Sequence, residues 1–454
     1  VWLALLSGLM QVGLGLGRFG WILNLVSAPV LAGFTQAATV LIVLSQLPAL
    51  LGMQGDWSTW LTMPHIDAAA AAFGLGSLAL LVAGKKLAPN APTVMVTVIG
   101  AGALSYASGF AGHGGAVIGS LPSGLPGLYW PGTLAWGTLG ALIVPAMVIT
   151  LVSFLETASS AKVENLREHK PWNDNQDLIA QGLAKLASGA TGSFPTSSSF
   201  SRSAINLYAG AQTGWATIVT VVMVLAVLLW LTPALYHVPS AVLAAVVVAA
   251  VSSLLKPASF VRLWRLLRME AFTMGVTFLV TLLTAPRIYW GVLTGVMLGL
   301  IDFLHQRLHP RIIEVGLHPD GSLRDRHLWN LEPLADHMYA LRMDAELDFA
   351  AASSFERNVS GYLAAHPDTR HVCLFAQPIN RIDATGVEVF SALRTALQAH
   401  GVTLHISGIK LPVETVLRRA GQLEDSPLLQ LYRTDAEALA HIAQLRSTHG
   451  TPAA

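Results

Sequence analysis

The residues of this 454-residue sequence with the clearest chemical potential form a run of hydroxyl side chains that ends in a cation. Positions 196–201 supply hydroxyl groups, and Arg202 follows them with a full positive charge. Gly192 and Pro195 interrupt a helix, whereas the hydroxyls can cap a helix that begins here. The free N–H groups and positive dipole end of such a helix attract anions. The pattern therefore predicts an anion site; the alternative is a polar linker whose arginine snorkels to water.

A carboxylate is the second candidate group. Glu156 lies in the apolar stretch 136–161, and Ser160 follows it one helical turn later on the same face. Burial disfavours the charged form of a carboxylate, whereas a nearby Arg202 favours it. An anion that neutralises Arg202 would then change the proton occupancy of Glu156 and couple proton entry to anion entry. The alternative is a helix-end carboxylate in the headgroup region, paired with Lys162.

The elements that must position these residues are membrane helices. The sequence is 53% hydrophobic and 12% charged, against about 25% charged residues in soluble domains. A crossing helix needs about 20 mostly apolar residues. Candidate spans are 1–17, 29–51, 66–84, 93–110, 133–155, 214–231, 238–255, 269–285 and 290–308. The segments 177–189 and 201–210 are too short to cross.

The positions of the cations predict the orientation of these spans. Basic residues in short loops stay on the cytoplasmic side. The loops that carry cations alternate with loops that do not, with Arg287 as the exception. All basic loops can lie on the cytoplasmic side only if the two short segments together enter and leave the membrane on the same side. One of them, 177–189, contains Lys185, whose side chain is expected to snorkel back to the cytoplasmic side and to have no role. The basic loop after Leu255 is also expected to be cytoplasmic, and so is the tail that follows the last span.

The charges divide the chain into two parts. Up to Leu308 the sequence has 14 basic and nine acidic residues, whereas the remainder has 13 basic and 17 acidic ones. The overall net charge of +1 gives no case for nucleic-acid binding. We predict a transmembrane transport domain over residues 1–308 and a cytoplasmic domain over residues 309–454.

The second part alternates strands with helices, as a small α/β domain does. The predicted strands are 312–317, 338–344, 371–376 and 403–407, and the predicted helices are 353–365, 386–399 and 412–420. It has no P-loop, nucleophile elbow, Rossmann glycine pattern or cluster of metal ligands. His371, His400 and His405 are expected on loops or surfaces, and the single cysteine, Cys373, in a buried strand. Thr385 is expected to cap the helix that follows Asp383.

Three stretches of the sequence resemble the SulP family, called solute carrier family 26 in animals. The most specific is 192–206, with Phe194-Pro195 and Ser201-Arg202-Ser203, preceded by 175–184. The segments 13–20 and 26–35 are similar to that family too, and the tail resembles a STAS domain through its residues 382–386. The resemblance covers nearly the whole chain.

The resemblance implies a polytopic α-helical membrane protein with a small cytoplasmic α/β STAS domain. The membrane fold would have fourteen segments in two inverted repeats of seven, split into core and gate subdomains, with the anion between two facing half-helices. Val1 would then correspond to the family's fourth segment, so the chain is expected to hold segments 4 to 14. This fragment alone is expected not to transport.

The resemblance also implies roles for individual residues. Residues matching Ser201 and Arg202 line the anion pocket of the family, with Ser199 and Phe200 beside them. Glu156 lies where relatives carry an acidic residue linked to cation coupling, with Ser160 nearby, and a glutamate there favours H+ over Na+ as coupling ion. Bacterial anti-sigma-factor antagonists have a phosphorylatable serine where this sequence has Ala384, which leaves Thr385 as the candidate.

The implied function is secondary active transport, not catalysis, and needs no cofactor or metal. The expected substrate is a small inorganic or organic anion such as sulfate, bicarbonate or fumarate, moved by proton-coupled symport and alternating access. An anion channel, an uncoupled anion exchanger and a ligand sensor are the alternatives. We expect a homodimer in the lipid bilayer of the inner (plasma) membrane. Its STAS domain would be cytoplasmic and a candidate to bind regulatory proteins.

Overall fold

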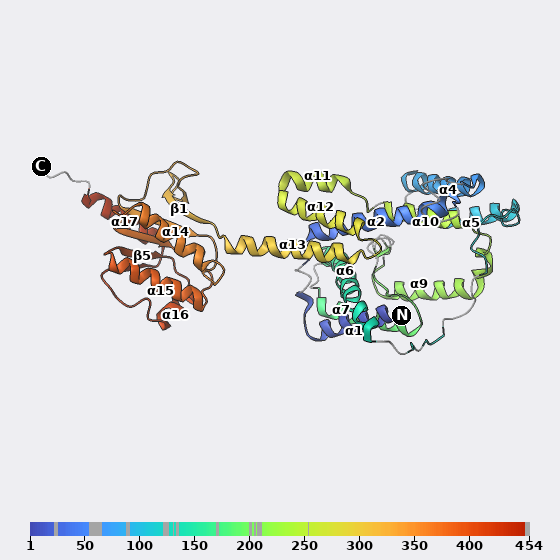
Figure 1. Ribbon diagram of the computed structural model, residues 1–454, viewed down its shortest axis with the longest axis horizontal. Coiled ribbons are helices and arrows are strands. Elements are labelled where there is room, and N and C mark those ends of the chain that lie inside the picture. Colours follow the sequence, from blue (N-terminus) through green and yellow to red (C-terminus); the bar gives the residue numbers. More distant parts are fainter. Residues whose placement is uncertain are drawn as a thin grey trace. The chain divides into compact units, whose positions relative to one another are not determined.

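The chain forms two compact units, Val1–Leu300 and Ile301–Ala454, in a computed structural model (Figure 1). We describe each unit by itself. The division falls inside one helix, α13 (Tyr289–Leu308). The structure describes residues 1–21, 26–53, 66–87, 91–120, 127–129, 131–132, 136–168, 172–198, 202–203, 206, 211–252 and 254–449.

The described part of the first unit is helical. The predicted spans appear as helices with boundaries shifted by a few residues, because long apolar runs specify helices more firmly than their ends. The helices are α1 (Trp2–Leu16), α2 (Ala28–Leu51), α4 (Ala68–Leu87), α5 (Thr93–Ala107), α6 (Trp136–Glu168), α7 (Asp174–Ala190), α9 (Trp215–Ala226), α10 (Ser240–Ser252), α11 (Pro257–Leu266), α12 (Arg268–Leu283) and α13. Two short turns, η2 (Val227–Leu231) and η3 (Thr232–Leu235), follow α9.

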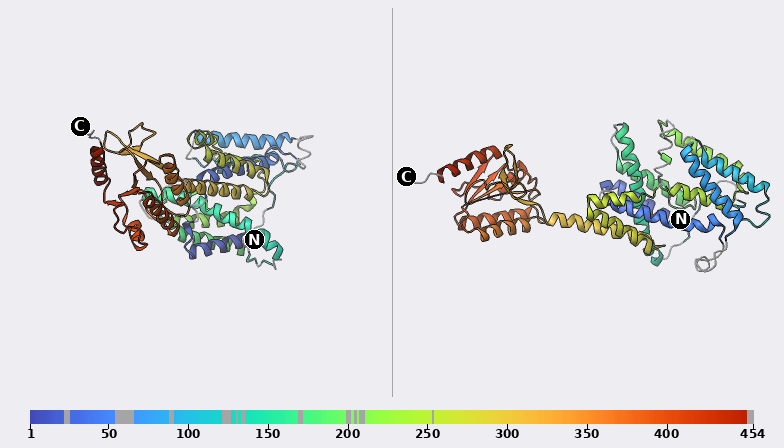
Figure 2. Two further views of the ribbon diagram at one scale, coloured as in Figure 1. Left: turned by 60° about the vertical axis from the view of Figure 1, so that its left-hand side comes forward. Right: turned by 90° about the horizontal axis from the view of Figure 1, so that it is seen from above.

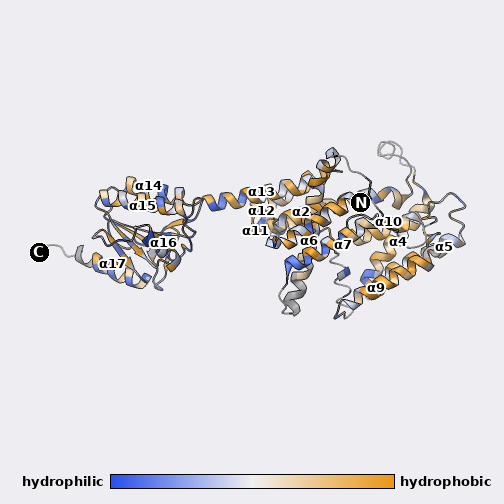
Figure 3. Cartoon of the chain, turned by 90° about the horizontal axis from the view of Figure 1, so that it is seen from below, coloured by the Kyte–Doolittle hydropathy of each residue, from blue (hydrophilic) through white to orange (hydrophobic). Residues whose placement is uncertain are grey.

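Several of these helices have the length and composition of membrane spans. Among the described residues, four stretches are long and apolar enough to cross a bilayer: Ala28–Leu51, Ala68–Leu87, Trp136–Ala158 and Ser240–Leu266. Shorter apolar helices cover Trp2–Leu16, Thr93–Ala107 and Trp215–Leu231. Hydrophobic residues extend along these helices (Figure 3), and no residue of α9 is buried. An apolar helix surface of this kind is suited to lipid rather than to water.

The expectation of a basic loop after Leu255 is wrong, because this segment forms the helix α11. Pro257 lies in its first turn, where a proline costs no backbone hydrogen bond. The cations Arg262 and Arg265 alternate with the exposed apolar residues Phe260 and Trp264. The cations of this segment indicate a loop, whereas the spacing of its aromatic residues, Phe260 and Trp264, is that of one helix face.

Glycines allow α1 and α7 to pack with their backbones in contact. A Cβ atom built on Gly182 of α7 would lie 2.7 Å from the carbonyl oxygen of Gly8 of α1, and one built on Gly8 would lie 2.8 Å from that of Gly182. The two helices run side by side (Figure 1). Small residues at membrane helix interfaces permit this close approach. The pair therefore forms a tight support for the chain that follows α7.

The helix α2 forms a second group with α10 and α12 (Figure 2). Gly33 of α2 lies against the backbone of α12, because a Cβ atom there would be 2.4 Å from the carbonyl oxygen of Met274. The helix α4 packs in turn on α10. The same small-residue packing therefore recurs away from α1 and α7.

The second unit contains a six-stranded sheet. The strand order is β2-β1-β3-β4-β5-β6. β1 (Ile312–Leu317) pairs antiparallel with β2 (Leu323–Asp325) and β3 (Met338–Met343). From β3, the strands β4 (His371–Phe375), β5 (Thr403–Ser407) and β6 (Leu429–Tyr432) are parallel. The predicted strands are confirmed, whereas β2 and β6 were not predicted because three or four residues carry little alternation.

Helices cover both faces of this sheet. The helices α14 (Ala352–Ala365), α15 (Ala384–Ala399) and α16 (Leu411–Arg419) contribute to one apolar core, as the sequence predicted. The unpredicted helix α17 (Asp435–His449) contributes Ala438 and Ile442 to a second core. Cys373 lies in β4 and is fully buried, which confirms its expected position.

The last turn of α13 belongs to this second unit and is bonded to its α/β fold. Arg307 donates to Glu346 (3.1 Å) and to Asp348 (3.3 Å), and the Ser354 hydroxyl donates to the carbonyl oxygen of Leu308 (2.8 Å). Asp348 is almost fully buried, so its carboxylate needs this cation. The end of α13 is thereby held to the start of the α/β fold.

Candidate anion and coupling site

The short helix α7 leads into the hydroxyl-rich run. The Asn173 side chain caps the start of α7 by accepting from the N–H of Gln176 at 3.1 Å. After Ala190 the chain turns at Gly192, which adopts the left-handed φ of +74° that suits glycine. Residues 193–198 are not helical. The predicted interruption of the helix at Gly192 is therefore present.

Hydrogen bonds attach this non-helical run to one face of α6. The Ser197 hydroxyl donates to a carboxylate oxygen of Glu156 at 3.2 Å. The hydroxyls of Thr157 and Ser198 also bond to each other. The structure thus brings the predicted coupling residue, Glu156, together with the start of the predicted anion-binding run.

Glu156 does not lie at a helix end. The helix α6 continues to Glu168, about three turns beyond it. Glu156 is exposed on the described structure, and its carboxylate accepts a hydrogen bond from Ser197. Glu156 is therefore not at the end of α6, but the apolar span Trp136–Ala158 ends two residues beyond it, so its position in the headgroup region stays a prediction.

The other predicted site residues are only partly described. Ser199, Phe200 and Ser201 lie outside the described residues. Ser160 belongs to α6, but its side chain is also outside them. Arg202 opens a described helical pair, 202–203, and is exposed. The roles proposed for these five residues stay predictions.

The expectation that Lys185 snorkels to the cytoplasmic side is wrong. Its side chain does not snorkel to the surface but is 0% exposed, and its ammonium donates to the Ser153 hydroxyl at 2.6 Å. Leu178, Gly182 and Lys185 recur on the buried face of α7. Residues spaced by four and three positions share one helix face, but only the packing of α7 shows that this face is the buried one.

Two glutamine side chains complete the polar cluster around Ser153. Gln11 of α1 donates to the Ser153 hydroxyl (3.1 Å) and to the side-chain oxygen of Gln181 (3.3 Å). The other amide atoms, Oε1 of Gln11 and Nε2 of Gln181, are buried without a hydrogen-bond partner among the described residues. Three helices therefore converge on a buried polar centre one turn from Glu156.

In the second unit, His405 is not on a surface as expected. It is buried in β5, where its Nδ1 bonds the Tyr432 hydroxyl and its Nε2 bonds Nδ1 of His371, both at 3.1 Å. Burial, and then the charges of His371 and His441, lower the pKa of His405 to about 4. No local pattern in the sequence indicates this burial, because the partners come from β4, β6 and α17.

Asp383, not Thr385, caps α15. Its carboxylate accepts from the N–H of Gly386 and from the N–H of Phe349, both at 2.9 Å. Burial alone would raise the pKa of Asp383, but these backbone donors outweigh it and lower the pKa. Thr385 lies inside the helix and is exposed.

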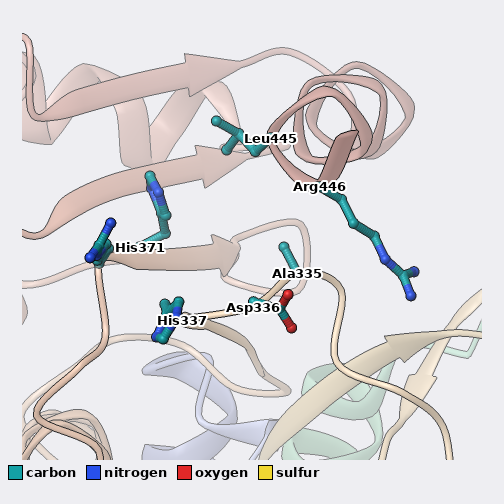
Figure 4. A pocket seen from close by; sticks show the side chains of 7 residues that line it. Ala335, Asp336, His337, His371, Leu445 and Arg446 are labelled. Carbon is teal, nitrogen blue, oxygen red and sulfur yellow. The ribbon is translucent and has the colours of Figure 1, made fainter. Parts of the chain in front are cut away.

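One surface pocket of the second unit is small. It is lined by His337, His371, Arg446 and four neighbours (Figure 4). Its cavity volume of about 20 Å³ suffices for one water molecule. His337 is already bonded to Asp368 at 2.8 Å and Arg446 to Glu332 at 3.0 Å. Within the described ranges, no group of three or more His, Cys, Asp or Glu residues is arranged to hold a metal.

Comparison with known proteins identifies the relatives of both units. The family model described as the sulfate permease family matches residues 1–277, and the STAS domain model matches residues 333–438. A probable sulfate transporter of Mycobacterium tuberculosis is 29% identical over 93% of this chain and 77% of its own length. The chloroplastic sulfate transporter 4.1 of Arabidopsis thaliana is 28% identical over 93% of this chain, which spans 65% of that protein.

A solved structure has the same fold. Murine solute carrier 26 family member A9, an anion transporter in the inward-facing state, matches with a TM-score of 0.85 at 20% identity. The match covers 97% of this chain and 75% of that one. The predicted fold class and family resemblance are confirmed. These relatives are transporters, not enzymes.

Proposed function

Because the chain belongs to the sulfate permease family, we propose that it is part of a secondary active transporter that moves a small anion across the membrane together with a proton. The candidate anions are sulfate, bicarbonate and a dicarboxylate such as fumarate. Relatives named as sulfate transporters support this substrate class. Alternating access between the two sides of the membrane would provide the movement.

One observation carries the proposal: the hydrogen bond from Ser197 to Glu156 at 3.2 Å. It joins the carboxylate of α6 to the run that leads into Ser199, Phe200, Ser201 and Arg202. A bound anion beside Arg202 would add negative charge near Glu156 and so favour its protonated form. Anion and proton would then bind together, as symport requires.

The same proposal includes the location of the protein in the cell. The apolar helices of the first unit support a multi-pass position in the inner (plasma) membrane. The cations of the loops support a cytoplasmic STAS domain. We also propose a homodimer, whose STAS domain is available to regulatory proteins.

The test is uptake by the full-length protein in proteoliposomes, with sulfate, bicarbonate and fumarate assayed in turn. With an inward proton gradient we expect at least one anion to accumulate above its external concentration, and without the gradient only to equilibrate. Glu156→Gln should retain anion binding and lose the response to the proton gradient, because the amide cannot take up the proton.

Each alternative has a distinct outcome in this assay. An anion channel dissipates gradients and never concentrates the anion. An uncoupled exchanger needs a second anion inside the vesicle and ignores the proton gradient. Proton-driven accumulation that is undiminished in Glu156→Gln would contradict the role given to this carboxylate.

A further inference from the structure

Lys185 is a fully buried cation in the middle of packed helices. Its side chain is 0% exposed, although lysine is almost never fully buried without a partner. The close contact of Gly182 with Gly8, one turn before Lys185, excludes water from this side of α7. The ammonium has three N–H groups, and the Ser153 hydroxyl accepts from it at 2.6 Å.

Among the described residues of the elements around Lys185, one acidic side chain lies near its ammonium. The helix α1 has no titratable side chain between Trp2 and Leu16, and residues 191–198 have none. In α6, Glu156 is the titratable residue between Trp136 and Ala158. Asp174 and Asp177 lie in the first turn of α7, with Asp177 two helical turns away from Lys185.

Glu156 is close enough to act as this counter-charge. Ser153, which Lys185 contacts, precedes Glu156 by three residues on α6, so the two side chains are neighbours on one helix face. A buried charge that loses its partner is strongly destabilising. Glu156 lies one helical turn from the hydroxyl that Lys185 contacts and is therefore the candidate counter-charge.

We propose that Lys185 is a positioning residue for proton coupling: its charge keeps Glu156 ionised until an anion binds, and so sets the pH at which uptake is half-maximal. This inference rests on the proposed function. Before binding, the pair is neutral as a whole and Glu156 holds no proton. The negative charge of an arriving anion offsets the charge of Lys185 at a distance, and Glu156 then takes up a proton from the acidic aqueous solution on the entry side.

A buried glutamine, Gln11, offers a hydrogen-bond acceptor in the polar cluster that contains Lys185. The Oε1 atom of Gln11 is an acceptor without a hydrogen-bond partner among the described residues, in the same cluster as the Lys185 ammonium. It is available to accept one of the remaining N–H groups when Glu156 becomes protonated. The cation would thus stay solvated by protein dipoles throughout the cycle.

The experiment is the pH profile of uptake by the full-length protein in proteoliposomes, using the anion that the wild type accumulates most. Lys185→Gln should move the midpoint to higher pH by about 1 unit or more, because the carboxylate then takes up its proton more readily. Lys185→Arg keeps the charge and should keep the midpoint. Lys86→Gln, which removes an exposed lysine at the end of α4, is the matched control and should leave the profile unchanged.

The outcomes separate this inference from the proposed function. If Glu156→Gln abolishes the pH dependence but Lys185→Gln leaves the midpoint in place, Lys185 has no such role while symport stands. If the wild type shows no proton-dependent uptake, the proposed function itself fails.

A folding defect would also be informative. If Lys185→Gln cannot be recovered as a monodisperse protein, the double variant with Glu156→Gln should be recovered, because it removes both charges of the pair. A double variant that is no better recovered than the single one would overturn the charge pair.

Discussion

At the scale of single residues, charges within the first unit are few, and their neighbours decide what they can do. Lys185 of α7 contacts Ser153 of α6, which precedes Glu156 by three residues on the same helix. Arg202 is described as helical together with Ser203 and is exposed. The predicted helix start at the hydroxyl run would add its dipole to this charge, which is why we expect an anion there.

The first prediction at this scale concerns Arg202. Arg202→Ala should reduce anion uptake by about tenfold to a hundredfold, the value of one charge-assisted hydrogen bond. The measurement is initial uptake in proteoliposomes, with gel-filtration elution as the check on folding. Arg287→Ala, which removes another exposed arginine of the first unit, is the control and should transport normally. Unchanged uptake in Arg202→Ala would remove this residue from the site.

The second prediction concerns His405. Its pKa is lowered to about 4 by burial and by His371 and His441, whereas the unfolded chain has the ordinary value of 6.5. Below pH 6.5 the unfolded state therefore binds more protons than the folded state, and stability falls as the pH falls towards 4. Between pH 7 and pH 5 this loss should be about 2 kcal/mol.

Urea unfolding of residues 301–454 at the two pH values measures this loss. His405→Phe should lose less stability than the wild type over the same interval, since it has no proton to bind. His400→Gln, at an exposed position after α15, should behave as the wild type does. An equal loss in His405→Phe and wild type would show that other groups cause the pH dependence.

At the scale of elements, the contact of α1 with α7 supports the run that follows α7. Gly182→Ala would place a Cβ atom 2.7 Å from the backbone of Gly8, so the helices must separate. We expect a loss of about 1–3 kcal/mol, as overpacking of a close interface causes. A lower thermal unfolding temperature in detergent is the measurement.

The matched control for this prediction is on α1 itself. A Cβ atom on Gly13 would meet nothing within 4 Å. Gly13→Ala should therefore preserve or slightly raise the unfolding temperature, because alanine favours a helix over glycine. Equal effects of the two substitutions would contradict the close-packing explanation.

At the scale of the whole molecule, the two units are adapted to different solvents. In the first unit large apolar side chains remain exposed, for example Val221 and Trp230 after the start of α9. In the second unit Phe355, Phe375 and their neighbours are buried in the two cores of the sheet. The excess of basic residues before Leu308 and of acidic residues after it follows this division.

The elements were largely predictable because their patterns are local. Long apolar runs identified the helices of the first unit, and alternation identified β1 and β5 with their observed bounds. The residue types and their spacing located the hydroxyl run and Glu156 in the sequence, and the family resemblance then implied roles for them. The short strands β2 and β6, the helix α11 and the cap at Asp383 were missed, since a few residues do not distinguish a strand, a helix or a loop.

By itself, the sequence determined that this protein has an apolar helical unit with an acidic α/β unit after it, because composition and periodicity depend only on neighbours along the chain. The tertiary structure alone decided that Lys185 and His405 are buried and that Ser197 meets Glu156. Each of these facts depends on side chains from separate elements: Ser153 of α6 beside α7, and Tyr432 of β6 beside β5. The environment of a charge is set by what packs around it in space, and spacing along one helix or strand cannot supply that.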